Sequence, residues 1–305
     1  MSESWDQSAR MKTSSRPSVP TLSFMVGGEE CQASCPCCIA KLTKGGCGNW
    51  NRCPTWYRNL SLVFKTADRF NVHTVMITGK GEPTLHMDDV RDVVSRSRGL
   101  GFITELQTNG FIFSEDKDSV DGLSADGLNT VAISRMSIDD ARNRSLMGEG
   151  SPNLKDIVKS FMDKGINVRL TYVGFQGEND TTQKIIETCK KAADFGVSQV
   201  TIRKMGKIDL KNSRKTNRAR DVIKFTDKNF IQDNEWMSVV NELRSSYKIG
   251  RTLDWGSVSW MIEGVECMVA DCLFLPGTSG AIRYLIYRPD GHFSYSWKYK
   301  NSLFF

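Results

Sequence analysis

The stretch His73-Thr-Val-Met-Ile-Thr-Gly-Lys-Gly-Glu-Pro-Thr84 decides the fold of this 305-residue chain. Its first half is a short run of apolar and β-branched residues, which predicts a buried strand over 73–78. The glycines that follow predict a loop whose backbone can approach a ligand closely. A helix is predicted next, at about 88–98. Strand, loop and helix in this order form one unit of a parallel sheet.

The same order recurs on both sides of this unit. Further strands are predicted at 21–26, 102–107, 130–134, 167–173 and 197–203, and further helices at 54–70, 151–163, 180–195 and 233–247. Alternating strands and helices predict a parallel sheet covered by helices. Six such units are too few to close an eight-stranded barrel. The expected fold class is therefore α/β, a partial (β/α)6 barrel of the TIM type that is open on one side.

The C-terminal part of the chain has a different pattern. Residues 281–287 and 292–297 alternate apolar and polar residues around Arg288-Pro-Asp-Gly291, which predicts a β-hairpin. We therefore expect three regions: a mobile tail over 1–20, the partial barrel over 21–247, and an extension over 248–305 that caps the active site.

Composition narrows the class of protein. The net charge is +6, and no run of about 18 apolar residues is present, so no membrane span is expected. The N-terminal residues lack the apolar centre of a secretory signal. Nine cysteines, four of them crowded into residues 31–38, indicate thiolate ligands in a reduced cytoplasmic protein rather than a disulfide framework. A monomer is the default expectation.

Cysteines gather in the loop after the first predicted strand, Cys31-Gln-Ala-Ser-Cys-Pro-Cys-Cys38. Three of them have the spacing CxxxCxxC, and three thiolates on one loop suit a four-iron cluster that keeps one iron open to a small molecule. A zinc site can also use closely spaced cysteines, so this spacing leaves zinc as the alternative.

Together, the cysteine triplet and the Gly79-Lys-Gly-Glu-Pro83 loop resemble the radical S-adenosylmethionine (radical SAM) superfamily. The resemblance implies that Cys31, Cys35 and Cys38 bind a [4Fe-4S] cluster, with Cys37 as a non-ligand. It implies that the open iron chelates SAM and that an electron cleaves it to a 5′-deoxyadenosyl radical, which takes hydrogen from a substrate. A reductant such as a flavodoxin or ferredoxin is then required.

The resemblance also implies which residues contact SAM. They are Lys80, Gly81, Glu82 and Pro83 in the loop after the second strand, Thr108 and Asn109 after the third, Ser134 at the end of the fourth, and Arg203 at the end of the sixth. Lys80 stands where the family usually has glycine, so its side chain is expected to point away from the SAM ammonium group or toward the carboxylate. The resemblance assigns no residue a catalytic role on the substrate.

Several substrates stay open at this point. The first is a small molecule or nucleotide. The second is RNA, because the GKGEP loop looks like the GMGEP loop of radical SAM methylating enzymes, with Cys267 or Cys272 as the methyl carrier. The third is a peptide, with Cys267 and Cys272 as the remnant of an auxiliary site. These two cysteines could also share a second metal with Cys47 and Cys53, or all four could be free thiols.

A different class of protein is also open. The stretch 203–220 is rich in lysine and arginine and holds a single acidic residue, Asp209. Such a patch binds phosphates or nucleic acid, or is a solvated loop. With zinc at the cysteine triplet, the chain would be a zinc-dependent nucleic-acid-binding protein.

Overall fold

The fold was obtained as a computed structural model, which describes residues 19–42, 54–116, 118–208, 215–252, 258–271, 282 and 284–295. The strands are β1 (Thr21–Met25), β2 (Thr74–Thr78), β3 (Ile103–Thr108), β4 (Thr130–Arg135), β5 (Asn167–Gly174), β6 (Gln199–Lys204), β7 (Ile249–Thr252), β8 (Val258–Ile262), β9 (Val265–Asp271), β10 (Tyr284–Tyr287) and β11 (Phe293–Ser294). The helices are α1 (Pro54–Arg69), α2 (Met87–Gly99), α3 (Ile112–Glu115), α4 (Asp118–Asp126), α5 (Asp140–Met147), α6 (Leu154–Met162), α7 (Thr182–Asp194), α8 (Asn217–Asn229) and α9 (Asp233–Ser246), with the 3-10 turns η2 (Ile39–Lys41) and η3 (Pro83–His86). The predicted tail up to residue 18, Cys47, Cys53 and Cys272 lie outside these ranges.

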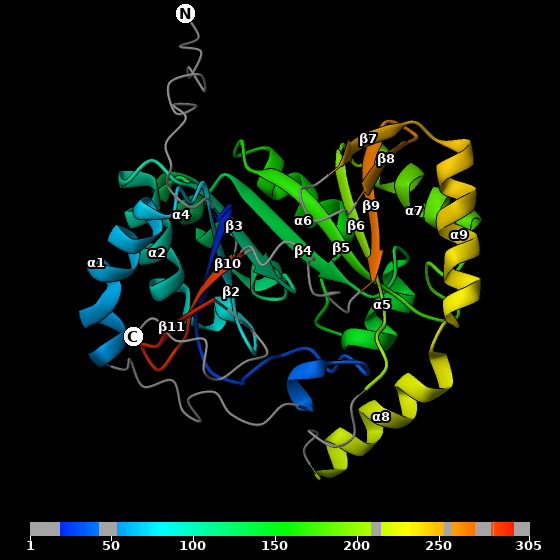
Figure 1. Cartoon of the computed structure of the whole chain (residues 1–305), viewed down its shortest axis with the longest axis horizontal. Coiled ribbons are helices and arrows are strands. Elements are labelled where there is room, and N and C mark those ends of the chain that lie inside the picture. The colour runs from blue at the N-terminus through cyan, green and yellow to red at the C-terminus, as the bar shows by residue number, and fades with distance from the viewer. Residues whose placement is uncertain are drawn as a thin grey trace, which may run out of the picture.

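One sheet organises the molecule, with its strands in the order β11-β10-β1-β2-β3-β4-β5-β6-β9-β8-β7. The six predicted strands are β1 to β6, and each pairs in parallel with the next. The sheet curves between α1 and α2 on one side of the molecule and α7 and α9 on the other (Figure 1). Within the described residues, the two end strands of this order, β11 and β7, do not pair with each other. The sheet is therefore open, and the expected open barrel of α/β class is confirmed.

The parallel pairing of two C-terminal strands with the sheet was not predicted. β10 pairs in parallel with β1, and β9 pairs in parallel with β6, so the parallel run is longer than six strands. The predicted hairpin is present as β10 and β11, and β7 and β8 continue the opposite end of the sheet in antiparallel pairing. The described strands after residue 248 therefore lengthen the sheet at both ends. The capping of the active site by this extension stays a prediction.

The two faces of the sheet have different chemistry. Alternate residues such as Val75, Leu106 and Ile133 are fully buried against the helices and form the main core. The residues between them point to the concave inner face. There the side chains are largely polar: Glu105 and Gln107 on β3, Ser134 on β4, Arg169 and Thr171 on β5, and Thr201 and Arg203 on β6. A polar inner face suits a binding site rather than a packed centre.

Helix α8 lies partly within the basic stretch, where no helix was predicted. The Thr216 side chain caps it by accepting a hydrogen bond from the Ala219 amide at 3.1 Å. Ala219, Val222 and Thr226 are buried along one side at helical spacing. Charged residues between these positions had obscured the pattern. None of the described helices has the length and apolar composition needed to cross a bilayer.

Candidate active site

The cysteine loop follows β1 at the carboxyl edge of the sheet. The Ser34 amide donates to the Met147 carbonyl at 2.8 Å, which ties the loop to the end of α5. Cys35 and Cys37 pack against an apolar cluster that includes Phe111, Met147 and Phe175. This cluster lies where β3, β4 and β5 end, so it shields one side of the loop from water.

The electrostatics of the loop suit a bound cation. Burial, together with the nearby thiolates of Cys38, Cys37 and Cys31, raises the pKa of the Cys35 thiol to about 12. Such a group ionises at neutral pH only if positive charge compensates it, and a metal centre supplies that charge. The Lys41 ammonium donates to the Cys35 carbonyl at 2.7 Å and slightly lowers the same pKa. By chemistry, three thiols on one loop fit an iron–sulfur cluster, but among the described residues no three Cys, His, Asp or Glu side chains are grouped so that they could hold a metal ion.

The loop between β2 and η3 lies directly against the cysteine loop. The Gly81 amide donates to the Gly28 carbonyl at 3.0 Å, and the Glu82 amide donates to the Glu30 carbonyl at 2.8 Å. The Lys80 ammonium forms an ion pair with Glu29 at 2.6 Å. The charge that replaces the family's glycine is thus held by a carboxylate of the neighbouring loop.

Gly81 is required by this close approach. A Cβ atom at this position would lie 2.1 Å from the Glu30 carbonyl oxygen, well inside van der Waals contact. The contact is with backbone, which cannot rotate away as a side chain can. The two loops can therefore meet only while position 81 is glycine.

Replacing Gly81 with alanine is expected to lower the free energy of unfolding by about 1–3 kcal/mol, because the extra methyl group forces two hydrogen-bonded backbones apart. Gly99→Ala is the matched control, since a Cβ there meets nothing within 4 Å. Urea unfolding of both variants checks the prediction. Equal stability of the two variants would show that the loops separate without cost.

Glu82 connects the second loop to the third. Its carboxylate is 5% exposed and accepts hydrogen bonds from the Thr108 hydroxyl at 2.7 Å, the Thr84 hydroxyl at 2.8 Å and the Asn109 amide at 2.8 Å. The Thr84 amide adds a fourth bond at 3.2 Å. Burial raises the pKa of Glu82, while the hydrogen bonds from Asn109, Thr108 and Thr84 act in the opposite direction. Glu82 thus fixes the position of Asn109 from inside the protein.

Asn109 reaches the cysteine loop. Its Nδ2 atom donates to the Cys31 Sγ atom at 3.4 Å, and its Oδ1 atom accepts from the Phe111 amide at 3.0 Å. The Thr108 hydroxyl is 2.9 Å from the Gly110 amide, from which it accepts a hydrogen bond. In this structure both predicted SAM-binding residues of the third loop therefore make hydrogen bonds within the protein. Their contact with SAM stays a prediction.

The remaining predicted SAM contacts lie at the same edge of the sheet. Pro83 is buried at the start of η3. The Ser134 hydroxyl accepts from the Thr171 hydroxyl at 3.2 Å on the inner face. Arg203 is exposed at the end of β6, opposite Val173 of β5 in the register. The fold therefore brings together all four strand ends on which SAM contacts were predicted.

Sequence reasoning missed an ion pair on the inner face. Glu105 of β3 and Arg169 of β5 form this pair, and the Gln107 Nε2 atom donates to the Glu105 Oε1 atom at 3.3 Å. The Arg169 Nε atom is buried and has no hydrogen-bond partner among the described residues. Charged residues at alternating positions of two predicted strands were the available signal for this pair.

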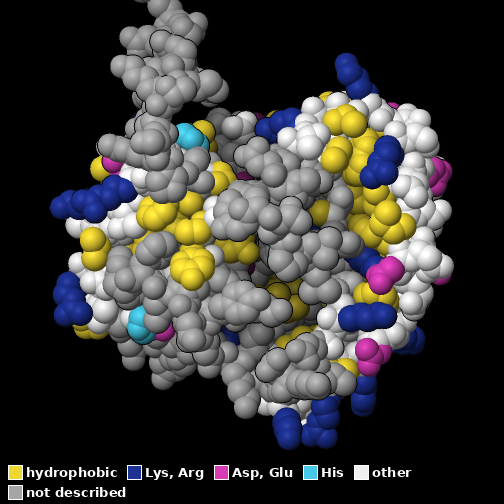
Figure 2. Space-filling model, in the orientation of Figure 1, with side chains coloured by type: hydrophobic (Ala, Val, Ile, Leu, Met, Phe, Trp, Pro, Cys, Tyr) yellow, Lys and Arg dark blue, Asp and Glu magenta, His cyan; other side chains and the backbone are white. Residues whose placement is uncertain are grey.

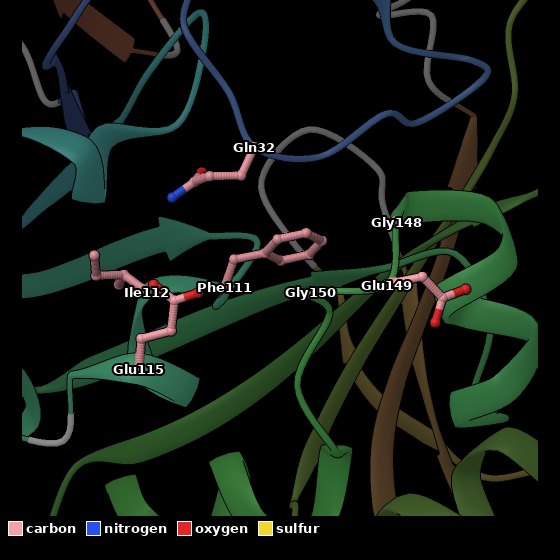
Figure 3. A pocket seen from close by; sticks show the side chains of 7 residues that line it. All are labelled: Gln32, Phe111, Ile112, Glu115, Gly148, Glu149 and Gly150. Atoms are coloured by element: carbon pink, nitrogen blue, oxygen red, sulfur yellow. The ribbon is translucent and has the colours of Figure 1, made fainter.

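A pocket of about 220 Å³ borders the cysteine loop on another side. Its wall is formed by Gln32, the start of α3 with Phe111, and the turn 148–150. Figure 3 shows Gln32 extending from the cysteine loop toward the segment that carries Phe111 and Ile112. None of the predicted SAM-binding residues lines this pocket, so we do not assign SAM to it.

Cys267 lies away from this edge. It is fully buried on the helix-facing side of β9, and Cys189 of α7 is fully buried as well. The two thiols are close enough for a hydrogen bond, which raises the pKa of Cys267. A methyl carrier must reach the substrate, and this face of the sheet is covered by helices. The position of Cys267 therefore gives no support to the role of methyl carrier or auxiliary ligand.

A family model confirms the class that this fold and this set of thiols suggest. Residues 25–192 match the model described as Radical SAM superfamily. This match covers more than half of the chain and includes the cysteine loop and the strands β2 to β5. The chain belongs to the radical SAM superfamily.

Solved structures show the same fold. SuiB of Streptococcus suis bound to S-adenosylmethionine is 16% identical, with 90% of this chain and 60% of SuiB covered and a TM-score of 0.58. The SuiB complex with its precursor peptide SuiA gives 15% identity, 91% and 60% coverage, and a TM-score of 0.55. The enzyme anSMEcpe with bound AdoMet and a Kp18Cys peptide gives 12% identity, 93% and 76% coverage, and a TM-score of 0.59. The chain thus spans about three fifths of the length of SuiB.

Proposed function

We propose that this chain cleaves S-adenosylmethionine reductively and takes a hydrogen atom from a small polar molecule or nucleotide bound on the inner face of the sheet. One observation carries the proposal. The chain from Glu82 through Asn109 to Cys31 joins the loop that resembles the family's SAM-binding segment to the thiols that would hold the cluster. The family match favours this class over a zinc-dependent nucleic-acid-binding protein.

Cys31, Cys35 and Cys38 would hold the [4Fe-4S] cluster. When bound, the cluster supplies the electron that cleaves SAM to the radical that abstracts hydrogen. The protein's part is to hold three thiolates on one loop, keep water from Cys35 and Cys37 with the apolar cluster, and donate a hydrogen bond to Cys31 from Asn109. Hydrogen bonds to cluster sulfurs raise the reduction potential, so Asn109 would ease reduction.

The predicted SAM contacts divide by what they do in the protein. Gly81 and Pro83 shape the loop, and Lys80 is neutralised by Glu29, so that loop can accept the SAM ammonium group without repulsion. Ser134 and the exposed Arg203 remain accessible at the strand ends for the polar groups of SAM or the substrate.

The inner face of the sheet supports a small polar substrate. A buried N–H of Arg169 without a partner costs about 1–3 kcal/mol, and a substrate oxygen would satisfy it. The adjacent Glu105 carboxylate offers an acceptor for a donor group of the same substrate. A small polar molecule bound against the inner face of the sheet would fit these groups.

A peptide is the second candidate. The SuiB and anSMEcpe structures that share this fold contain peptides, and both have TM-scores above 0.5. A side chain of a peptide could enter the same inner face. An RNA substrate has less support, because Cys267 is buried behind the sheet and Cys272 lies outside the described residues.

The proposal is tested by anaerobic reconstitution with iron and sulfide, followed by dithionite and SAM. Formation of 5′-deoxyadenosine supports it. A folded protein that holds about four irons and never forms 5′-deoxyadenosine, with or without cell extract, contradicts it.

The free thiols of the described residues fit a reducing compartment, which supports the expected cytoplasmic location.

The inner face gives a separate prediction. A metabolite fraction free of peptides and proteins is expected to stimulate 5′-deoxyadenosine formation by the wild type. Arg169→Met should reduce the stimulated part at least about tenfold, because a charge-assisted hydrogen bond contributes about 1.5–3 kcal/mol. The unstimulated rate should not change. Glu105→Gln combined with Arg169→Met controls for the unpaired carboxylate, and stimulation by a peptide fraction alone would favour the peptide candidate.

A further inference from the structure

Helix α8 lies beside the cysteine loop. Its buried residues Ala219 and Val222 pack against Leu42, which directly follows the turn η2. That turn begins at Ile39, the residue after Cys38. α8 and η2 lie close together in Figure 1, near the lower edge of the molecule. Helix α8 is therefore adjacent to the site proposed for the cluster, with its buried side toward the cysteine loop.

The exposed side of α8 carries a row of positive charge. Arg220, Lys224 and Lys228 are spaced four residues apart, so they lie on one face of the helix, opposite the buried Ala219 and Val222. We call these three residues the basic stripe. All three are exposed, and within the described ranges no ion pair joins any of them to a carboxylate. Figure 2 shows Lys and Arg side chains gathered at the lower edge, where Figure 1 places α8.

The loop that packs against the other side of α8 exposes an apolar residue. Ile39 is 73% exposed, although it directly follows Cys38. Lys41, two residues further on, is partly buried and donates to the Cys35 carbonyl. In a protein–protein interface with an apolar centre and a polar rim, Ile39 would supply an apolar contact and the basic stripe would supply charge at the rim.

We propose that Ile39 and the basic stripe form the docking surface for an acidic one-electron carrier protein, such as a flavodoxin. This inference rests on the proposed function, which requires a reductant. The carrier loses one electron and the cluster site gains it, while no bond to the carrier forms or breaks. Docking here brings the carrier next to the loop of Cys38, and opposite charge speeds the encounter.

Nucleic acid is the competing ligand for the basic stripe. One feature favours the carrier protein. Ile39 adds an apolar contact that a phosphate backbone does not use.

The test reverses the charge of the basic stripe in the triple variant Arg220→Glu, Lys224→Glu and Lys228→Glu. The cluster-loaded protein is titrated with an acidic, low-potential flavodoxin, and the dissociation constant is measured at low and at high salt. We expect at least a tenfold loss of affinity at low salt and a smaller loss at high salt, because salt screens exposed charges. Flavodoxin-driven 5′-deoxyadenosine formation should fall in parallel, while the dithionite-driven rate stays unchanged.

The control makes the same change of charge elsewhere. Arg58, Lys65 and Arg69 are exposed on α1, on another side of the molecule, and their triple replacement by glutamate should leave flavodoxin affinity unchanged. If the stripe variant does not fold, the neutral replacement Arg220→Gln, Lys224→Gln and Lys228→Gln takes its place. On a logarithmic scale, the expected loss of flavodoxin affinity is then about half of that expected for the charge reversal.

Distinct results separate the possible failures. Unchanged flavodoxin affinity in the stripe variant overturns the docking surface, and so does an equal loss in the α1 control. Loss of salt-dependent binding to a single-stranded RNA with unchanged flavodoxin affinity would assign the stripe to nucleic acid instead. Absence of dithionite-driven 5′-deoxyadenosine in the wild type contradicts the proposed function, whereas the measured flavodoxin affinity still tests the surface by itself.

Discussion

Replacing Cys35 with alanine is expected to abolish 5′-deoxyadenosine formation. Cys35 is the middle ligand of the proposed set, and its thiol is the one whose pKa burial and the nearby thiolates raise to about 12. A thiol in that position is ionised only with a cation bound, so its loss removes a ligand that no water molecule replaces on the apolar side of the loop. Because changes to groups that merely orient metal ligands already cost about 10–100-fold, removal of a ligand should exceed about 100-fold.

Cys37→Ala is the matched control for this prediction. Cys37 lies in the same loop and packs against the same apolar cluster, but the CxxxCxxC spacing leaves it out. Iron content and 5′-deoxyadenosine are measured for both variants after anaerobic reconstitution. Activity that disappears with Cys37 and persists without Cys35 would reassign the ligands to a different trio of the loop.

Replacing Glu82 with glutamine is expected to lower the free energy of unfolding by about 1–3 kcal/mol and to weaken SAM binding. A glutamine can keep one oxygen for Thr108 and Thr84, but its NH2 group then faces the Asn109 amide, which is also a donor. The buried Asn109 amide loses its acceptor, and its side chain loses its fixed position beside Cys31. Urea unfolding and SAM titration measure the two effects.

The effect of Glu82 on stability depends on pH with a defined sign. Burial raises the pKa of the folded carboxyl above its usual value of 4.5, so ionisation is harder in the folded than in the unfolded protein. The protonated Glu82 carboxyl therefore contributes to the stability of the folded protein. This contribution is complete below pH 4.5 and is lost as the pH rises through the raised pKa of the folded protein. The stability advantage of the wild type over Glu82→Gln should therefore narrow as the pH increases.

Local patterns in the sequence were sufficient for the parallel core. Runs such as 73–78 show the buried strand directly, and polar residues follow each run where the strand ends. In a parallel sheet those ends share one edge, so the cysteine loop and the Gly79–Pro83 loop had to be neighbours. The family match and the order β1 to β6 confirm this part. Helix α8 was not predicted from the sequence, because charged residues interrupt its short apolar side.

The sequence by itself determined the class of protein, because the spacing of three cysteines and the order of strands and loops are properties of neighbouring residues. Tertiary structure alone decided the contacts that join distant segments. Asn109 meets Cys31 across 78 positions, Thr108 meets Glu82 across 26, and β9 and β10 extend both ends of the parallel run. No local period encodes such contacts, since they depend on how strands far apart in the chain are placed side by side and on which side chains then share the buried space between them.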